Sequence, residues 1–141
     1  MFLKALLVCD DVRFEQAGAM SLIGVHRERL AGIATSAGGI QFPKFFGVAM
    51  LGGLTGITEI QHRWQLRAVD SEIASRERPY ESEPRDGSSD EHVFVFGNAP
   101  LVFPHPGRFE VLLDVIAMGK RASYNYLVVV DALRARADES A

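Results

Sequence analysis

Apolar and polar residues alternate along much of this chain, and the alternation is clearest in IQHRWQLRAVD, residues 60–70. The even-numbered residues from Ile60 to Ala68 form one face, which contains Trp64, while the odd-numbered residues from Gln61 to Arg67 form a polar face. A repeat of two residues is typical of an antiparallel strand with one side in the core and the other in water. We therefore expect a half-buried strand here.

A second alternating stretch is RFEVLLDV, residues 108–115, in which the odd-numbered residues from Phe109 to Val115 are all apolar. It follows PHPG, residues 104–107, and prolines suit a corner between strands because they lack a backbone donor and fix φ. The segment AMGKR, residues 117–121, predicts a hairpin turn around Gly119. The apolar run SYNYLVVV, residues 123–130, predicts the last strand.

Less regular strands are predicted at residues 3–15, 20–29, 44–51 and 92–103, the last of them interrupted at Gly97-Asn98. Turn residues separate these short runs, which are rich in β-branched and aromatic side chains. The pattern predicts an all-β fold, a single antiparallel β-sandwich of about seven to eight strands with an immunoglobulin-like layout. The chain has 141 residues, 48% of them hydrophobic, which suits one domain, placed at residues 1–131.

Two polar segments depart from this pattern. Residues 70–91, DSEIASRERPYESEPRDGSSDE, contain eight acidic residues and three arginines, so the acidity of the chain, whose net charge is −3, belongs to this segment. Because it has too few apolar residues to offset the entropy of ordering it, we expect a long mobile loop. Residues 132–141 form a short polar tail, for which a frayed end is expected.

Asp10 and Asp11 stand inside the first predicted strand, and two explanations remain open. A β-bulge at this pair would turn the apolar residues before and after it toward the same side, and we favour this explanation. Strict alternation would instead bury Asp10, which would then need an arginine or several N–H donors. A metal or acid/base site built from Asp10, Asp11 and Glu15 is disfavoured, because adjacent strand residues point to opposite faces and calcium needs about six to eight oxygens.

The stretch LLVCDDVRFEQAGAMSLIGVH, residues 6–26, resembles the start of a group of small bacterial proteins of the DUF6941 type, a domain of unknown function. FPKFFGVAM, residues 42–50, and PGRFEV, residues 106–111, extend the resemblance, whereas the acidic segment at 70–91 departs from it. The resemblance implies that CDDVR and SLIGV form one structural hairpin. It implies no activity, ligand or catalytic residue.

No motif for catalysis or for cofactor binding stands out. The chain has four histidines, His26, His62, His92 and His105. They form no zinc-binding motif; His62 is expected at the core or its rim, and His105 at an exposed corner. Cys9 is expected to be a buried structural residue, since the neighbouring Asp10 would raise the pKa of its thiol. We predict no catalytic, cofactor-binding or metal-ligating residue and no cofactor.

Two further side-chain groups each have two interpretations. Trp64 alternates with apolar residues and is expected in the core, although an exposed tryptophan would be able to stack on a sugar. Arg63 and Arg67, on the opposite face of the same strand, form a modest basic stripe. The simple interpretation of this stripe is a sheet face exposed to water. The more specific interpretation is a patch that binds an anionic partner.

The charge balance and the N-terminus limit the classes of function that we expect. With a net charge of −3, a nucleic-acid or anionic membrane surface is not expected, and no run approaches the roughly 20 apolar residues of a membrane span. The single cysteine and the lack of a signal-peptide pattern favour a cytoplasmic protein. We expect a non-catalytic intracellular interaction or assembly module, not an enzyme, with an unknown protein partner or a homo-oligomer formed through sheet edges. The alternative is a small-ligand or carbohydrate-binding sandwich.

Overall fold

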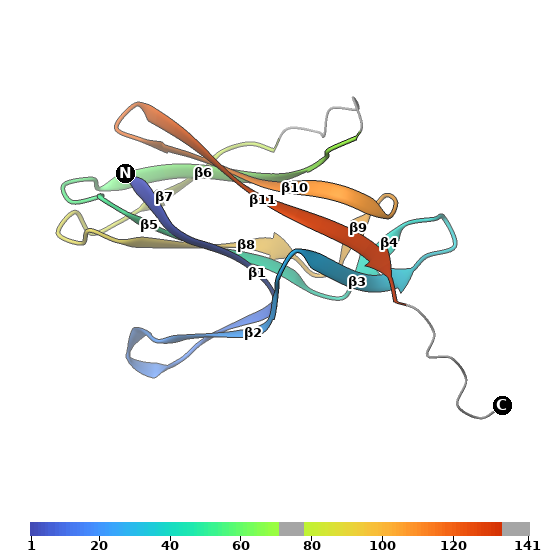
Figure 1. Ribbon diagram of the computed structural model, residues 1–141. Helices are drawn as coiled ribbons and strands as arrows, with labels where there is room; N and C mark the ends of the chain where they lie inside the picture. The colour runs from blue at the N-terminus through green and yellow to red at the C-terminus, as the bar shows by residue number, and fades with distance from the viewer. Residues whose placement is uncertain (71–77, 134–141) are drawn as a thin grey trace.

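The computed structural model describes residues 1–70 and 78–133, most of which lie in strands (Figure 1). In chain order the strands are β1 (Phe2–Phe14), β2 (Met20–His26), β3 (Arg29–Ala34), β4 (Ile40–Phe42), β5 (Phe45–Gly52), β6 (Glu59–Ala68), β7 (Glu81–Pro84), β8 (His92–Asn98), β9 (Leu101–Phe103), β10 (Gly107–Ala117) and β11 (Lys120–Ala132). A short 3-10 turn, η1 (Gln16–Gly18), connects β1 to β2. Among the described residues, no helix is long and apolar enough to span a membrane.

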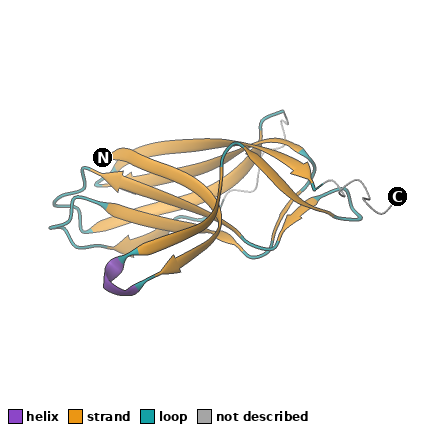
Figure 2. Cartoon of the chain, turned by 60° about the horizontal axis from the view of Figure 1, so that its bottom comes forward, coloured by secondary structure: helices purple, strands orange, loops and turns teal. Residues whose placement is uncertain are grey.

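The strands form two sheets that pack against each other (Figure 2). One sheet has four strands in the order β2-β1-β5-β8, and the other is curled and has seven strands in the order β7-β6-β10-β11-β3-β4-β9. We call them the small sheet and the large sheet. The predicted all-β, sandwich-like fold is therefore confirmed.

The strand count and one pairing differ from the expectation. The described residues form eleven strands, whereas the sequence predicted about seven to eight. The strands that were missed, β3, β4 and β7, have six, three and four residues, so they are shorter than the runs of eight or more residues from which strands were predicted. Pairing is also not wholly antiparallel, because β3 runs parallel to β11, with Leu30 opposite Val130.

The core lies between the two sheets and is centred on phenylalanine rings. Phe103 meets Phe42, Phe45 and Phe109 edge to face, with ring centroids 5.5, 5.7 and 4.9 Å apart. These rings come from β9, β4, β5 and β10, so the cluster joins the small sheet to the large one. Trp64 packs against Phe96 at 5.5 Å and is only 7% exposed, which confirms it as a core residue.

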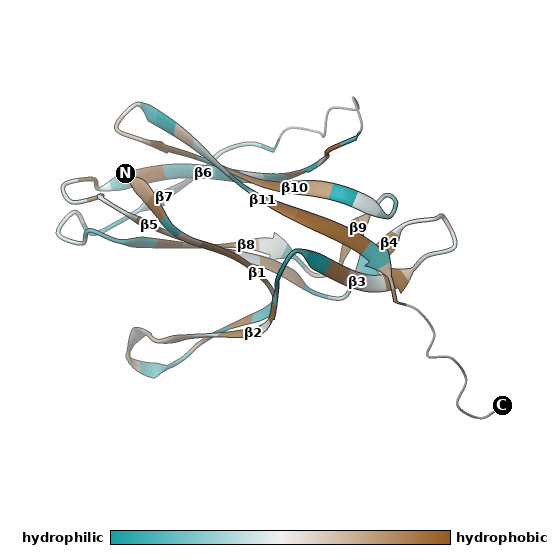
Figure 3. Cartoon of the chain, viewed as in Figure 1, coloured by the Kyte–Doolittle hydropathy of each residue, from teal (hydrophilic) through white to brown (hydrophobic). Residues whose placement is uncertain are grey.

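The hairpin of β10 and β11 follows the sequence prediction closely. Phe109, Val111, Leu113 and Val115 are all buried, so the expected phase of β10 is confirmed. Pairing continues without a shift from Gly107 opposite Val130 to the turn at residues 118–119. Figure 3 shows the apolar second half of β11 as a brown band. The broken strand expected at 92–103 is likewise present as β8 and β9.

The bulge expected at Asp10 and Asp11 is wrong. Pairing of β1 with β2 runs without a shift across both residues, and the register shift of β1 against β5 lies between Leu3 and Ala5 instead. The burial of Asp10 that strict alternation implied does not occur either, because Asp10 is exposed. Pairing with β5 stops at Cys9, and beyond that point only β2 continues alongside β1. The pair of strands projects from the sandwich as a hairpin (Figure 1), as the resemblance implied.

The expected mobile loop is wrong for residues 78–91. They contain β7, which pairs with β6, and the Arg85 guanidinium donates to the carbonyls of Leu54, Ile57, Ser89 and Glu91. These bonds hold the β5–β6 and β7–β8 connections together. Residues 78–91 are therefore ordered by polar contacts, whereas the other strands are ordered by burial of apolar side chains. Residues 71–77 and the tail from 134 onward lie outside the described residues.

Candidate functional site

Asp10 and Asp11 contact two different partners. Oδ1 of Asp10 lies 2.6 Å from Nε2 of His26, while Oδ2 of Asp11 lies 3.3 Å from Nζ of Lys44. Gly24 leaves room for the Asp10 carboxylate, because a Cβ at this position, which has φ +64°, would collide with it. Since the two carboxylates bind different partners, the structure does not bring them together as one site.

Cys9 is fully buried on β1. Burial raises the pKa of its thiol, and the charge of the adjacent Asp10 raises it further, more than the backbone hydrogen bond from Asp11 lowers it. A thiolate is the nucleophilic form of cysteine. The surroundings of Cys9 therefore hold it in its unreactive form, as the sequence predicted.

The outer face of the large sheet carries a polar network instead of a basic stripe. Asp114 on β10 accepts hydrogen bonds from Nε of Arg63 at 3.0 Å, from the hydroxyl of Ser123, and from Nη2 of Arg121 at 3.4 Å. Arg67 pairs with Glu110 four residues further along the same two strands. The more specific interpretation, a patch for an anionic partner, is therefore not supported, because each arginine of the stripe has a carboxylate beside it.

Two histidines and two glutamates meet where the edges of the sheets approach each other. His62 on β6 is 3% exposed, with Nε2 3.6 Å from Glu81 and Nδ1 3.7 Å from Glu83. Nε2 of His92 lies 2.9 Å from the other oxygen of Glu83. The rings of both histidines pack on Phe94, at 4.7 and 4.6 Å. His62 is thus at the rim of the core, as expected, and it lies between two carboxylates.

This histidine–glutamate cluster does not form a metal centre. Across residues 1–70 and 78–133, no three His, Cys, Asp or Glu side chains are arranged so that they would hold a metal ion. His62 faces its two glutamates with different ring nitrogens, so the pairs point in different directions. His105 lies apart from the cluster, exposed, with Nδ1 2.6 Å from the carbonyl of Pro106.

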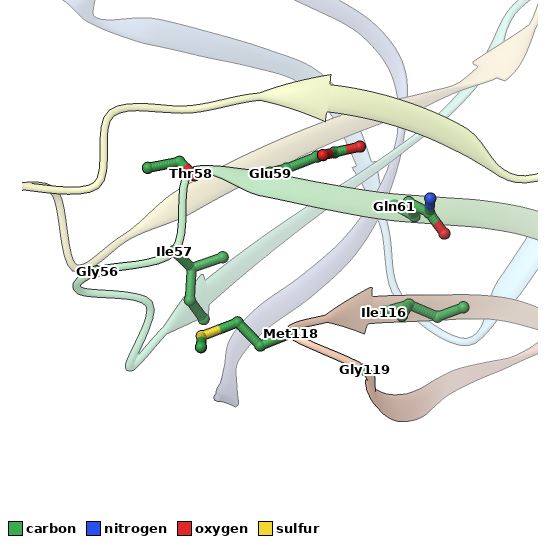
Figure 4. A pocket seen from close by; sticks show the side chains of 8 residues that line it. All are labelled: Gly56, Ile57, Thr58, Glu59, Gln61, Ile116, Met118 and Gly119. Atoms are coloured by element: carbon green, nitrogen blue, oxygen red, sulfur yellow. The ribbon is translucent and has the colours of Figure 1, made fainter.

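A hollow of about 370 Å³ opens where the β5–β6 connection meets the β10–β11 turn (Figure 4). Glu59 and Gln61 lie along β6, Ile116 lies on β10, and Met118 lies at the turn. Glu59 is the one carboxylate in the lining, and it already accepts a hydrogen bond from the Ser82 hydroxyl at 2.6 Å. Glu59 is therefore the side chain of this hollow that could exchange a proton with a ligand, and Ser82 already donates to it.

Sequence reasoning missed Asp114, Arg85 and the pair Glu81 and Glu83. The alternating glutamates of ESE, residues 81–83, are a period-two signal that would have been visible within the acidic segment. Asp114 and Arg85 gave no such signal, because their partners lie on other strands and connections. No family model, curated protein or solved structure matches this chain.

Proposed function

We propose that this protein is a non-catalytic interaction and assembly module that associates through the edge strand β2, with a second copy of itself as the partner. The observation that supports this most is that, among the described residues, β2 pairs only with β1 and has its other edge open. Its sequence, MSLIGVH, has no lysine, arginine, acid or proline, and Ile23 and Val25 are 38% and 49% exposed. An open, apolar edge without such residues is a template for pairing with another strand.

The other sheet edges among the described residues are protected. The strand β7 has four residues, two of them glutamates, and ends in Pro84. The strand β9 has three residues and lies between Pro100 and Pro104. At β8, His92 bonds to Glu83 of β7, which ties the edge to the opposite sheet. Short length, proline and inward-pointing charge are the usual means of blocking edge pairing, and β2 has none of them.

A second copy suits β2 because the strand has no acidic residue, lysine or arginine. In a two-fold antiparallel pair centred on Ile23, Ile23 would face its own copy and Ser21 would face Val25. Like charges directly opposite each other disfavour a strand pair, and no such pair arises here. A two-fold interface uses the same patch on both partners, which a self-complementary strand provides.

The non-catalytic part of the proposal is supported by the chemistry of the side chains already described. The Cys9 thiol is buried with a raised pKa, and the carboxylates of Asp10, Asp11 and Asp114 are all engaged in pairs. Nucleophilic and acid–base catalysis both need a group that is free to reach a substrate. The intracellular location and the resemblance to the DUF6941 type stay predictions.

We also infer an immunoglobulin-like layout. With β2, β3, β4 and β9 set aside, the sheets have the orders β1-β5-β8 and β7-β6-β10-β11, which parallel the A-B-E and C′-C-F-G strands of an immunoglobulin sandwich. Trp64 lies buried on β6, in the place of strand C, where antibody domains bury a tryptophan. The inter-sheet disulfide of those domains has no counterpart, because the chain has one cysteine.

Small-ligand binding is the second candidate, and the hollow of Figure 4 is the observation that favours it. Its lining mixes apolar Ile116 and Met118 with the polar Glu59 and Gln61. Carbohydrate binding has less support, because Trp64 has Arg78 over its ring at 4.0 Å and Phe96 beside it. A sugar would need an aromatic face that is open to water.

The assembly proposal is tested by the mass of the purified protein in solution. We expect a dimer by light scattering and sedimentation, and a monomer for Ile23→Lys, because a lysine there opposes its own copy across the two-fold axis. Ile33→Lys is the matched control, since Ile33 on β3 is 55% exposed and lies outside the hairpin. It should stay dimeric. A wild-type protein that is monomeric at every concentration tested would refute the proposal.

A further inference from the structure

A groove follows the open side of the sandwich between β7 and β8. Two hollows line it and share Val95, one of about 200 Å³ beside Glu81 and one of about 320 Å³ beside Glu83. The first is walled by the rings of Phe46, Trp64 and Phe96. The second is walled by Phe14 and Met20 of the projecting hairpin and by Val93. The groove thus has apolar walls and one carboxylate in each half.

The two glutamates lie at alternate positions of one strand. Cross-strand pairing places Glu81 opposite His62 and Glu83 opposite Ile60, so both glutamates point to the inner side of β7. Alternate residues of a strand lie about 7 Å apart. The Glu81 side chain is 77% exposed and that of Glu83 is 41% exposed, so both carboxylates remain accessible from the groove.

His62 adds an unsatisfied group between these carboxylates. Its side chain is 4% exposed, it lines the first hollow, and its Nδ1 has no hydrogen-bond partner within residues 1–70 and 78–133. The 3.7 Å to Glu83 is too long for a hydrogen bond. A buried polar atom without a partner is unfavourable, and a donor brought into the groove would satisfy it.

We propose that this groove binds an extended segment of a partner protein that carries lysine or arginine at alternate positions. In an extended peptide, side chains two residues apart have the same spacing as Glu81 and Glu83. One cation would then meet each carboxylate, and the aliphatic stems of the cations would lie against the apolar walls. The groove shares Met20 with β2, but its carboxylates lie on β7, so the inference does not rest on self-association.

The chain itself shows how such a cation is held. The Arg78 guanidinium lies over the Trp64 ring at 4.0 Å, and Trp64 lines the first hollow. Aromatic faces attract cations, and the attraction increases as water is excluded. Inward-pointing glutamates also protect the short strand β7 from edge pairing. Edge protection explains why β7 carries two glutamates. It does not explain why Nδ1 of His62 lacks a hydrogen-bond partner among the described residues.

The test uses three synthetic peptides and the fluorescence of Trp64, the one tryptophan of the chain. The peptides, blocked at both ends, are VKVKV, its isomer VKKVV with adjacent lysines, and VEVEV. We expect VKVKV to bind and to change the Trp64 emission, and VKKVV to bind about tenfold more weakly because only one lysine reaches a carboxylate. VEVEV should not bind.

Protein variants complete the experiment. The double variant Glu81→Gln/Glu83→Gln should bind VKVKV about tenfold more weakly, and added salt should then have less effect on its affinity. Glu28→Gln, which removes one charge from the exposed β2–β3 turn, should bind VKVKV as the wild type does. Equal affinity for VKVKV and VKKVV, or an unchanged affinity in the double variant, would overturn the inference, as would a lack of binding by the folded wild type.

Discussion

At the scale of single residues, Asp114 is a buried carboxylate held by three side-chain donors. It is 5% exposed on the outer face of the large sheet and accepts hydrogen bonds from Arg63, Ser123 and Arg121. Burial by itself raises the pKa of Asp114, but the hydrogen bonds from Ser123 and Arg63 and the charge of Arg121 outweigh it, so the pKa is lowered. The neighbours therefore keep this carboxylate ionised.

A lowered pKa in the folded state gives Asp114 a defined pH dependence. Its stabilising contribution is fully present above the unfolded value of about 3.9 and is lost as the pH falls through the folded value. We expect Asp114→Asn to lower the free energy of unfolding by about 3 kcal/mol at neutral pH, because two arginines lose their shared partner. The difference from wild type should begin to shrink below about pH 4, where the unfolded chain takes up the proton, and should disappear once the pH has passed the lowered folded value and the wild-type carboxyl is also neutral.

Urea unfolding at neutral and acidic pH measures this effect. Asp131→Asn is the control: Asp131 is exposed and 3.7 Å from Arg29, so its loss should change the free energy of unfolding by less than about 1 kcal/mol. An Asp114→Asn variant that is equally destabilised at both pH values would show that packing, and not charge, determines the effect.

At the scale of elements, the β10–β11 hairpin shows a conflict between its turn and its sequence. The turn residues Met118 and Gly119 have φ of +49° and +72°, and Ala117 pairs with Lys120 across them. Two central residues with positive φ define the type I′ turn, which favours Asn-Gly and disfavours a side chain such as that of methionine. Met118 is also 78% exposed, so it gains little from burial.

Met118→Asn should therefore raise the free energy of unfolding by about 1 kcal/mol, because asparagine tolerates the left-handed conformation. Gly119→Ala should lower it by about 1 kcal/mol for the opposite reason. Thermal unfolding of both variants measures the two changes. Lys120→Ala, just outside the turn, serves as the control and should lie within about 0.5 kcal/mol of wild type. A destabilised Met118→Asn would contradict the turn geometry.

At the scale of the whole molecule, Arg85 connects segments that lie far apart in the sequence. Its guanidinium donates to carbonyls of the β5–β6 connection and of the β7–β8 connection. Asp90 acts in the same place, accepting from the backbone N–H of Gly53 at 3.2 Å and from the Thr55 hydroxyl at 3.0 Å. These contacts fix one end of the sandwich across both sheets.

Arg85→Ala should destabilise the protein by about 2–3 kcal/mol, because several carbonyls lose a charged donor. Hydrogen exchange should increase first in residues 53–58 and 86–91, while the β10–β11 hairpin stays protected. Arg13→Ala on the projecting hairpin is the control, since Arg13 is exposed. If exchange increased equally throughout the chain, Arg85 would stabilise the whole fold and not this end alone.

The sequence by itself determined the long strands that have one face exposed to solvent. The alternation in residues 60–70 and 108–115 correctly predicted which side chains of β6 and β10 face the core. The segment AMGKR correctly predicted the turn that joins β10 to β11. The sequence also placed Trp64 and Cys9 in the interior. Such features are local, because an alternating pattern states which side of a strand meets the core.

Only the tertiary structure decided which strands pair and which charges meet. Alternation does not say that β3 lies parallel to β11, nor that the acidic segment contributes β7, since both depend on partners far away in the chain. Asp10 stays in water because β5 ends beside Cys9. The candidate groove likewise exists because the edges of two sheets bring His92 of β8 and Glu83 of β7 together, and that proximity is a property of the fold.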